Sequence, residues 1–374
     1  MLTETQIRFL RLRSQRLLAA KAPASPTGVL KDIFAVQAQD LPAARLSIQA
    51  RSAGETALSV ENARQEERSI VWIWALRGTL HLLTAKDCLW LIPFLGPDLI
   101  LKDQRRLYQL GWDERKVSHA LRLIESTIER QGGLTRQEIR QLLEDHHLPS
   151  EGQAPIHLLY RGAMECRLCP GPDRDGSLTY VGFEEWIGKP RVEDRPAALA
   201  QLARRYLKAY APAGPADLAA WSGLKMEEAR RAFQLVKDET VMVETKIEPA
   251  WLLKEQAVGL EDLPDDPLEG NLTVRLLPRF DAYLLGYKSR DFCIDPKYAR
   301  RIHPGGGMIL TACIINGKVQ GTWKTRKRKK GLEILLEPFE TLPDEAMPLL
   351  AREASEIGRF LGQETELTIT KPGI

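Results

Sequence analysis

One arrangement of secondary structure recurs three times along the chain: two or three helical segments followed by one or two short strands. The third copy is the clearest, because residues 215–222 predict a short helix, Gly223 a turn, and residues 226–236 a longer helix before a strand at 241–247. Two helices joined by a tight glycine turn form a helix-turn-helix motif. The repeat therefore predicts a chain built from tandem winged-helix domains.

The two earlier copies follow the same order. Residues 1–95 predict helices, one of them capped by Asp40 with Pro42 in its first turn, and then a β-rich segment around Gly78. In the second copy an amphipathic helix spans 114–131, and Thr135 with Glu138 has the spacing of a capping box. A third helix at 155–162 and a hairpin within 166–181 complete it.

The composition changes after an acidic linker. Residues 272–374 carry several short strands, and Asn316-Gly317 between apolar runs is a strong hairpin signal. We therefore expect an α+β fold, with three tandem winged-helix (helix-turn-helix) domains followed by a small β-rich, barrel-like C-terminal domain. The predicted boundaries are 1–112, 113–194, 195–260 and 272–374.

Composition and hydropathy limit where such a chain works. The 374 residues are 44% hydrophobic and 28% charged, which is typical of a globular protein. The longest apolar run, residues 70–76, is too short to cross a bilayer, and the N-terminal residues lack the apolar stretch of a signal peptide. We expect a cytoplasmic monomer without a membrane partner.

The cysteine pattern argues against a metal centre. Of the five cysteines, Cys166 and Cys169 form a lone C-x-x-C pair, whereas a structural zinc site needs four ligands. His146 and His147 are adjacent and would diverge on a helix. We therefore expect free thiols, no metal and no cofactor.

The positive charge is concentrated rather than large. The net charge is +3, yet residues 324–330 (KTRKRKK) hold six basic residues in seven, among them Lys324, Arg326 and Lys327. A cluster of this kind can bind phosphates despite a near-neutral total. A solvated hairpin tip explains the run equally well.

The usual catalytic signatures are missing: there is no P-loop, no H-E-x-x-H and no G-x-S-x-G. Gln37 and Gln39 stand out instead, as polar residues in the apolar segment FAVQAQDLP. In an extended backbone, residues two apart face the same way, so two carboxamides here could hold one water between them. The alternative is a helix end with polar caps.

Three further segments carry candidate substrate- or DNA-binding residues. On a strand, Arg77, Thr79 and His81 would share one face, although a solvent-facing edge has the same pattern. Asp281 and Tyr283 either line a pocket or satisfy buried backbone groups. His303 leads a glycine-rich loop that includes Gly305, which could approach a nucleic-acid backbone closely or form a plain turn. His303 and Gly305 are the last of the candidate DNA-binding residues in these segments.

Several long motifs, taken in order, resemble the AlkZ and YcaQ-like family of bacterial DNA glycosylases. They are the Q-A-Q element at 37–39, RGTLHL at 77–82, ADLAAWSGL at 216–224, LLPRFDAYLLGYKSRD at 276–291 and GTW at 321–323. The resemblance covers nearly the whole chain. It implies three winged helices and a β-domain around a DNA-binding channel. It also implies base-excision repair of double-stranded DNA with alkylated bases, by removal of N7-alkylguanine and unhooking of interstrand crosslinks.

The resemblance also implies which residues act. One branch of the family carries Q-apolar-Q and the other Q-apolar-D, and Gln37, Ala38 and Gln39 match the first. A carboxamide is too weakly basic to take a proton near neutral pH, but it can orient water and direct a carbonyl dipole at a developing cation. Gln37 and Gln39 are then the catalytic residues of a monofunctional glycosylase.

Two other functions fit the same sequence. A non-catalytic winged-helix DNA-binding protein, such as a transcriptional regulator, would use the glutamines only as structural groups. An RNA-binding or protein-interaction module would draw on the basic run at 324–330. Excision of N7-methylguanine from DNA separates the enzyme from both.

Overall fold

The computed structural model describes residues 1–18, 21–246 and 248–372, and the chain divides into two compact units. The first unit comprises residues 1–60 and 199–374, and the second comprises residues 61–198. Both mix helices and strands, so the α+β prediction is confirmed. One boundary between the units lies within helix α4 (Ala57–Gln65), and the other lies within helix α10 (Arg195–Tyr210).

The second unit begins with the antiparallel hairpin of β2 (Ile70–Trp74) and β3 (Leu80–Thr84), in which Ile73 lies opposite His81. A single 3-10 turn, η1 (Leu76–Gly78), joins the two strands. Arg77 lies in this turn with a φ of +56°, so the prediction that Arg77 lies on a strand is wrong.

Helix α5 (Ala85–Gln109) follows the hairpin and was not predicted. It contains Pro93 and Pro97, and a proline inside a helix removes a backbone donor and normally signals a break. The helix forms nevertheless, capped by Thr84, and it packs closely on helix α8 (Ala154–Met164). A Cβ on Gly96 of α5 would collide with the Met164 carbonyl oxygen, so this close approach requires a glycine.

The rest of the second unit has the predicted helix, helix, helix and hairpin order. The predicted helix at 114–131 is confirmed, and so is the capping box, in which the Thr135 backbone N–H donates to the Glu138 carboxylate at 2.7 Å. The three strands pair in the order β4-β6-β5. The elements are α6 (Glu114–Gln131), β4 (Leu134–Thr135), α7 (Arg136–Asp145), α8, β5 (Leu168–Arg174), β6 (Ser177–Gly182) and α9 (Phe183–Trp186).

In the first unit the predicted helix-turn-helix is confirmed. Helix α11 (Pro215–Ser222) ends at Gly223, whose φ of +81° is the left-handed conformation typical of a helix C-terminus, and α12 (Met226–Leu235) follows. A hairpin of β7 (Thr240–Val243) and β8 (Ala250–Leu253) comes next.

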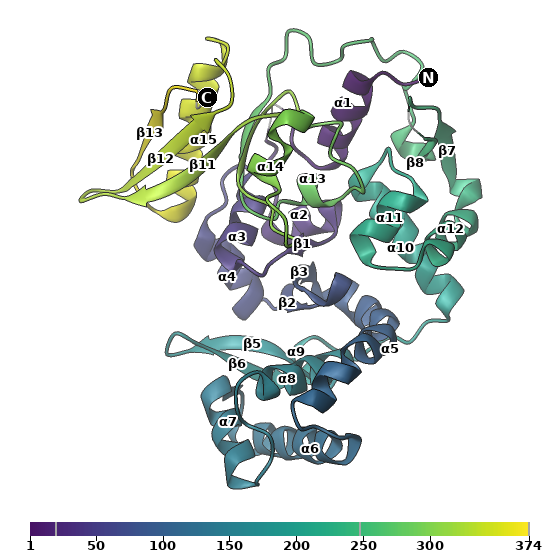
Figure 1. The fold of residues 1–374 in the computed structure, drawn as a ribbon, viewed down its shortest axis with the longest axis vertical. Coiled ribbons are helices and arrows are strands. Elements are labelled where there is room, and N and C mark those ends of the chain that lie inside the picture. The colour runs from purple at the N-terminus through teal and green to yellow at the C-terminus, as the bar shows by residue number, and fades with distance from the viewer. Residues whose placement is uncertain (19–20, 247, 373–374) are drawn as a thin grey trace. The chain divides into compact units, whose positions relative to one another are not determined.

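The C-terminal part of the first unit is a five-stranded sheet with the order β13-β12-β11-β10-β9. Figure 1 shows β11, β12 and β13 of this sheet beside α15. Asn316 and Gly317 have φ values of +49° and +75° and form the predicted hairpin turn. Among the described strands, β9 and β13 each pair with one neighbour, so the sheet is open rather than the expected barrel. Its elements are β9 (Val274–Leu277), β10 (Ala312–Ile315), β11 (Lys318–Lys327), β12 (Leu332–Pro338) and β13 (Thr365–Ile369), and α15 (Ala346–Leu361) packs on it.

The remaining elements of the first unit precede this sheet or interrupt it. They are α1 (Glu4–Ser14), α2 (Pro26–Ile33), β1 (Val36–Gln37), α3 (Leu41–Gln49), α13 (Ala282–Leu285) and α14 (Ala299–Ile302). Across the described ranges, no helix combines the length and the apolar character that crossing a membrane requires.

Candidate functional site

Gln37 and Gln39 lie in the short connection between α2 and α3. Phe34 caps the C-terminus of helix α2, and its φ of +69° turns the chain sharply. Its ring is buried, and the centroid of the ring lies 5.5 Å from that of Trp221. After this turn the backbone is extended at Val36 and Gln37. The fixed Phe34 ring thus sets where the extended segment begins.

Helix α3 starts immediately after the glutamines. Its N-cap is Asp40, which accepts a hydrogen bond from the Ala43 backbone N–H at 3.1 Å, and Pro42 stands in its first turn. The predicted cap is therefore confirmed. A capped helix on one side and a buried aromatic anchor on the other hold the connection in place.

The two carboxamides contact each other directly. Gln37 Nε2 donates a hydrogen bond to Gln39 Oε1 at 2.9 Å, which confirms that the side chains face the same way. The prediction that one water lies between the two carboxamides is wrong, because the amide groups are already at hydrogen-bond distance from each other. Their environments differ: Gln37 is only 8% exposed, whereas Gln39 is exposed. Gln39 is the member of the pair that solvent reaches.

Arg279 lies beside this connection and was not among the predicted site residues. Its Nη1 atom is 3.6 Å from Asp40 Oδ2, and its side chain is 41% exposed. The next residue, Phe280, has a φ of +58°, which turns the backbone between Arg279 and Asp281. The signal in the sequence was an arginine within the same motif that gave Asp281 and Tyr283.

Asp281 and Tyr283 are core residues rather than pocket residues. Asp281 is 0% exposed and accepts hydrogen bonds from Arg51 Nη1 at 2.8 Å, Arg51 Nη2 at 2.7 Å and Ser47 Oγ at 2.8 Å. The buried Tyr283 hydroxyl donates to the Gly317 carbonyl at 3.0 Å. Of the two expectations, the structure supports the structural one, since neither side chain reaches the surface.

The glycine-rich loop lies close to Arg279. His303 Nδ1 is 2.7 Å from the Met308 carbonyl oxygen, so this ring nitrogen donates, and Gly305 forms an isolated bridge with Met308. The Met308 sulfur is in turn 3.9 Å from Arg279 Nη2. Gly305 is exposed with a φ of +112°, in the region that favours glycine. The predicted loop is thus a neighbour of Arg279, which contacts Asp40.

Arg77, Thr79 and His81 belong to the second compact unit and do not share a face. His81 is 2% exposed, and its Nδ1 donates to the Thr79 carbonyl at 2.9 Å. Burial, followed by the positive charge of Arg77, lowers the pKa of His81 to about 3. The imidazole is therefore neutral near pH 7, and its ring has almost no exposed surface to offer a ligand.

The basic run forms the end of the β11–β12 hairpin. Lys324 pairs with Glu337 at 2.5 Å, and Arg326 lies 3.7 Å from Glu333. Lys327 is exposed in the last position of β11. Carboxylates on the opposite strand therefore offset part of the charge of the run.

The C-x-x-C pair does not assemble with other ligands. Cys166 and Cys169 are free thiols, and burial raises the pKa of both. Throughout the described ranges, no group of three or more His, Cys, Asp or Glu side chains is placed to hold a metal ion.

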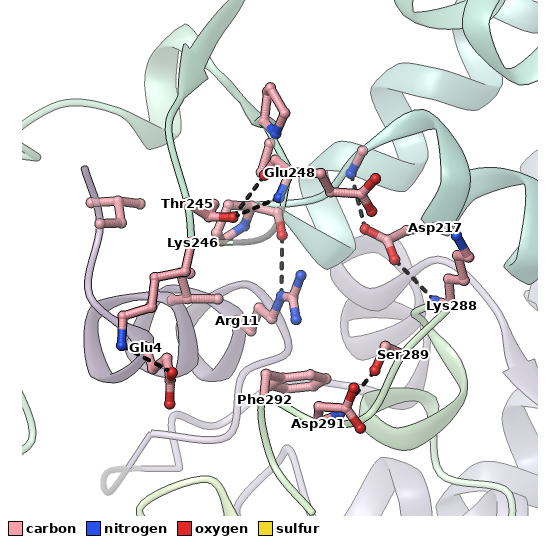
Figure 2. Close-up of a pocket in the computed structure, with 16 residues that line it drawn as sticks. Glu4, Arg11, Asp217, Thr245, Lys246, Glu248, Lys288, Ser289, Asp291 and Phe292 are labelled. Carbon is pink, nitrogen blue, oxygen red and sulfur yellow. Dashed lines mark hydrogen bonds and ion pairs between the residues drawn. The ribbon is translucent and has the colours of Figure 1, made fainter.

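The first unit also contains a cavity of about 270 Å³. Figure 2 shows the side chains that line it. The Arg11 guanidinium lies 3.9 Å from the centroid of the Tyr287 ring and 4.3 Å from that of Phe292. Three of its charged groups have partners within the lining, since Lys246 pairs with Glu4 and Asp217 accepts from the Lys288 backbone N–H at 2.9 Å. None of the predicted site residues is among the described residues that line it.

Comparison with known proteins places these observations in a family. The family model for "DNA glycosylase AlkZ-like" matches residues 30–360. An interstrand DNA cross-link repair glycosylase of Streptomyces sahachiroi is 28% identical, over 94% of this chain and 95% of that protein. The solved structure of the S. sahachiroi DNA glycosylase AlkZ superposes with a TM-score of 0.80 at 24% identity, covering 99% of this chain and 100% of the other.

The family match spans most of the chain and includes Gln37, Gln39, Arg279 and the glycine-rich loop. Enzymes of this kind hydrolyse the N-glycosidic bond between a base and deoxyribose, which is the step that opens base-excision repair. The chain belongs to the AlkZ-like family of DNA glycosylases.

Proposed function

We propose that this enzyme removes N7-alkylated guanine from double-stranded DNA and unhooks interstrand crosslinks formed through such bases. The S. sahachiroi relative, named for interstrand crosslink repair, supports the second part. The observation that carries the proposal is the 2.9 Å hydrogen bond from the buried Gln37 to the exposed Gln39. This bond from the buried Gln37 holds the Gln39 carboxamide in one orientation, so Gln39 presents a defined face to solvent.

The lesion supplies much of the driving force. Alkylation at N7 makes guanine cationic, so the base leaves as a neutral molecule when the bond from C1′ to N9 breaks and its electron pair stays on N9. The sugar then resembles an oxocarbenium ion, and water adds its oxygen to C1′ while its proton passes to solvent. Such a reaction needs a positioned water and a stabilised cation more than a strong acid.

The glutamine pair fits these two needs. A carboxamide oxygen has two lone pairs, and that of Gln39 uses one to accept the bond from Gln37. The other is then directed at a water or at the developing cation. In this proposal Gln39 contacts the reacting atoms, and Gln37 is a positioning residue that holds the Gln39 oxygen in place.

The DNA would be held by groups around this pair. We infer that Arg279 and the backbone of the glycine-rich loop at Gly305 contact phosphates next to the lesion, because the partly exposed Arg279 lies beside Asp40 and contacts Met308, which is bridged to the exposed Gly305. We also propose winged helices over the expected ranges 1–112, 113–194 and 195–260, the second with α6–α8 and β5–β6 and the third with α11–α12 and β7–β8. The wild-type enzyme should dock on duplex DNA as a monomer.

The deciding experiment is an excision assay on a duplex with one N7-methylguanine, beside a matched duplex with uracil. We expect release of N7-methylguanine and little release of uracil, since uracil leaves as an anion and a carboxamide cannot protonate it. No excision from either duplex, with DNA binding intact, would support a non-catalytic DNA-binding protein instead.

Substitutions at position 39 test the electrostatic role. We expect Gln39→Asp to retain excision, because an ionised carboxylate stabilises the cation and accepts a proton. Gln39→Leu is close to glutamine in size but lacks the dipole, and it should lose activity. Single-turnover rates on N7-methylguanine DNA measure the difference. If Leu is active and Asp is not, position 39 only fills space.

The basic hairpin end makes a separate prediction. Lys327 and Lys329 are exposed, and replacing both with alanine should weaken DNA binding and lower the slope of log K against log salt by about 0.9 per lost contact. Lys318→Ala, at the other end of β11, removes a charge from the same strand as a control. An unchanged slope in the double variant would make the run a solvated tip.

A further inference from the structure

The second compact unit contains a cavity of about 300 Å³ that the proposed chemistry does not use. It lies where the η1 turn faces helices α5 and α8. Its polar lining consists of Arg77 from η1, Lys102 and Asp103 from α5, and His157 and Tyr160 from α8.

Asp103 and His157 form a tight pair in this cavity. His157 Nδ1 lies 3.0 Å and 2.9 Å from the two carboxylate oxygens of Asp103, and each side chain is about one-fifth exposed, at 21% and 20%. Asp103 is the carboxylate among the described lining residues, and both of its oxygens face the His157 imidazole. The negative charge of Asp103 is therefore partly offset before any ligand arrives.

Tyr160 adds a fixed hydroxyl donor. Its ring meets the Trp74 ring edge-on, with centroids 5.8 Å apart. Burial, followed by the nearby charge of Asp103, raises the pKa of the Tyr160 hydroxyl, so it keeps its proton. A Cβ built on Gly78, whose φ is +71°, would lie 3.1 Å from this oxygen, so the backbone of the turn passes close to it.

Two positive groups complete the lining. Arg77 has a φ of +56°, a left-handed backbone conformation that residues other than glycine rarely adopt. Residues held in such conformations are found preferentially at functional sites. Lys102 is exposed on α5. The lining thus holds two basic side chains and one carboxylate, and that carboxylate faces an imidazole.

We propose that this cavity binds a phosphate group of the DNA backbone. An arginine fork, a lysine ammonium and a tyrosine hydroxyl are donors of the kind that recognise phosphate oxygens, and the cavity is positive and open to solvent. The inference rests on the proposed function for the identity of DNA as the phosphate donor. The proposed phosphate contact involves Lys102, Tyr160 and the His157–Asp103 pair. These residues lie in the second unit, whereas Gln37 and Gln39 lie in the first.

The test compares Lys102→Ala with Lys86→Ala, which removes the same charge from the same helix at an exposed position outside the cavity. Binding to a duplex is measured as a function of salt. We expect Lys102→Ala to lower the slope by about 0.9, which weakens binding about eightfold at 0.1 M salt, and Lys86→Ala to change neither. Lys102→Arg should restore the slope. A wild-type slope in Lys102→Ala overturns the proposal.

Tyr160→Phe removes a donor without removing a charge. It should weaken DNA binding severalfold and leave the salt slope unchanged, because no counterion release is lost. Circular dichroism checks that each variant keeps its fold. If Tyr160→Phe binds duplex DNA as tightly as the wild type, the Tyr160 hydroxyl does not contact the phosphate, and the proposed set of donors is contradicted.

The source of the phosphate is decided by the imidazole signals of His157 in ¹H–¹⁵N spectra, assigned with His157→Gln. Duplex DNA should shift them in the wild type and much less in Lys102→Ala. Shifts with inorganic phosphate but none with DNA would make this a free-phosphate site and overturn the DNA contact. Excision is measured separately, so an inactive protein that shows these shifts contradicts the proposed function and leaves this inference standing.

Discussion

Replacing Gln37 with alanine should slow excision of N7-methylguanine about a hundredfold, or by about 3 kcal/mol in activation free energy. The loss follows because Gln39 Oε1 is held by the Gln37 amide at 2.9 Å, and without it the exposed Gln39 side chain samples several rotamers. Single-turnover rates at saturating DNA measure the effect. DNA affinity should not change, since Gln37 is buried away from solvent.

Gln37→Glu distinguishes a positioning role from a merely structural one. A protonated carboxyl at this buried position donates to Gln39 Oε1, whereas an ionised one can only accept, which turns the Gln39 amide around. Burial raises the pKa of such a carboxyl. We therefore expect activity at low pH that is lost as pH rises, after correction for spontaneous base loss. An equal loss at every pH would make Gln37 a structural residue only.

Local signals in the sequence predicted the local structure well. Gly223 between two short helices and Asn316-Gly317 between two apolar runs each specify a backbone conformation that few residues adopt, and both turns are present. The capping box at Thr135 works in the same way, because its two hydrogen bonds lie within four residues. Such features need no information from distant parts of the chain.

Features that depend on distant contacts were not predictable. Helix α5 contains two prolines, yet it forms, and part of its length packs against α8. Asp281 is polar within an apolar stretch and resembled a site residue, because its partner Arg51 lies 230 positions away. The sequence cannot tell a buried ion pair from a pocket carboxylate when the partner is that remote.

The glutamine pair was predicted only in part. The spacing of two residues correctly placed both side chains on one side of the chain. It could not show that Gln37 is buried and Gln39 exposed, which follows from the turn at Phe34 and the cap at Asp40. Arg279 was missed because its proximity to Asp40 depends on the turn at Phe280.

Breaking the buried ion pair should have the largest effect on stability. Asp281→Asn keeps the shape and one acceptor oxygen, but it leaves the fully buried Arg51 guanidinium without its counter-charge. Removing one partner of a buried pair costs about 3–5 kcal/mol, because the remaining charge is desolvated and uncompensated. Urea unfolding monitored by circular dichroism measures the free energy of unfolding directly.

The double variant shows that the loss comes from the unpaired charge. Arg51→Met with Asp281→Asn removes both charges, so it should be less destabilised than the sum of the two single variants. The comparison also separates the two roles first considered for Asp281. If Asp281→Asn unfolds like the wild type but fails to excise N7-methylguanine, Asp281 acts on the substrate. If it loses stability while the folded fraction excises at the wild-type rate, its carboxylate serves to hold α3 and α13 together, and through α3 the connection that carries Gln37 and Gln39.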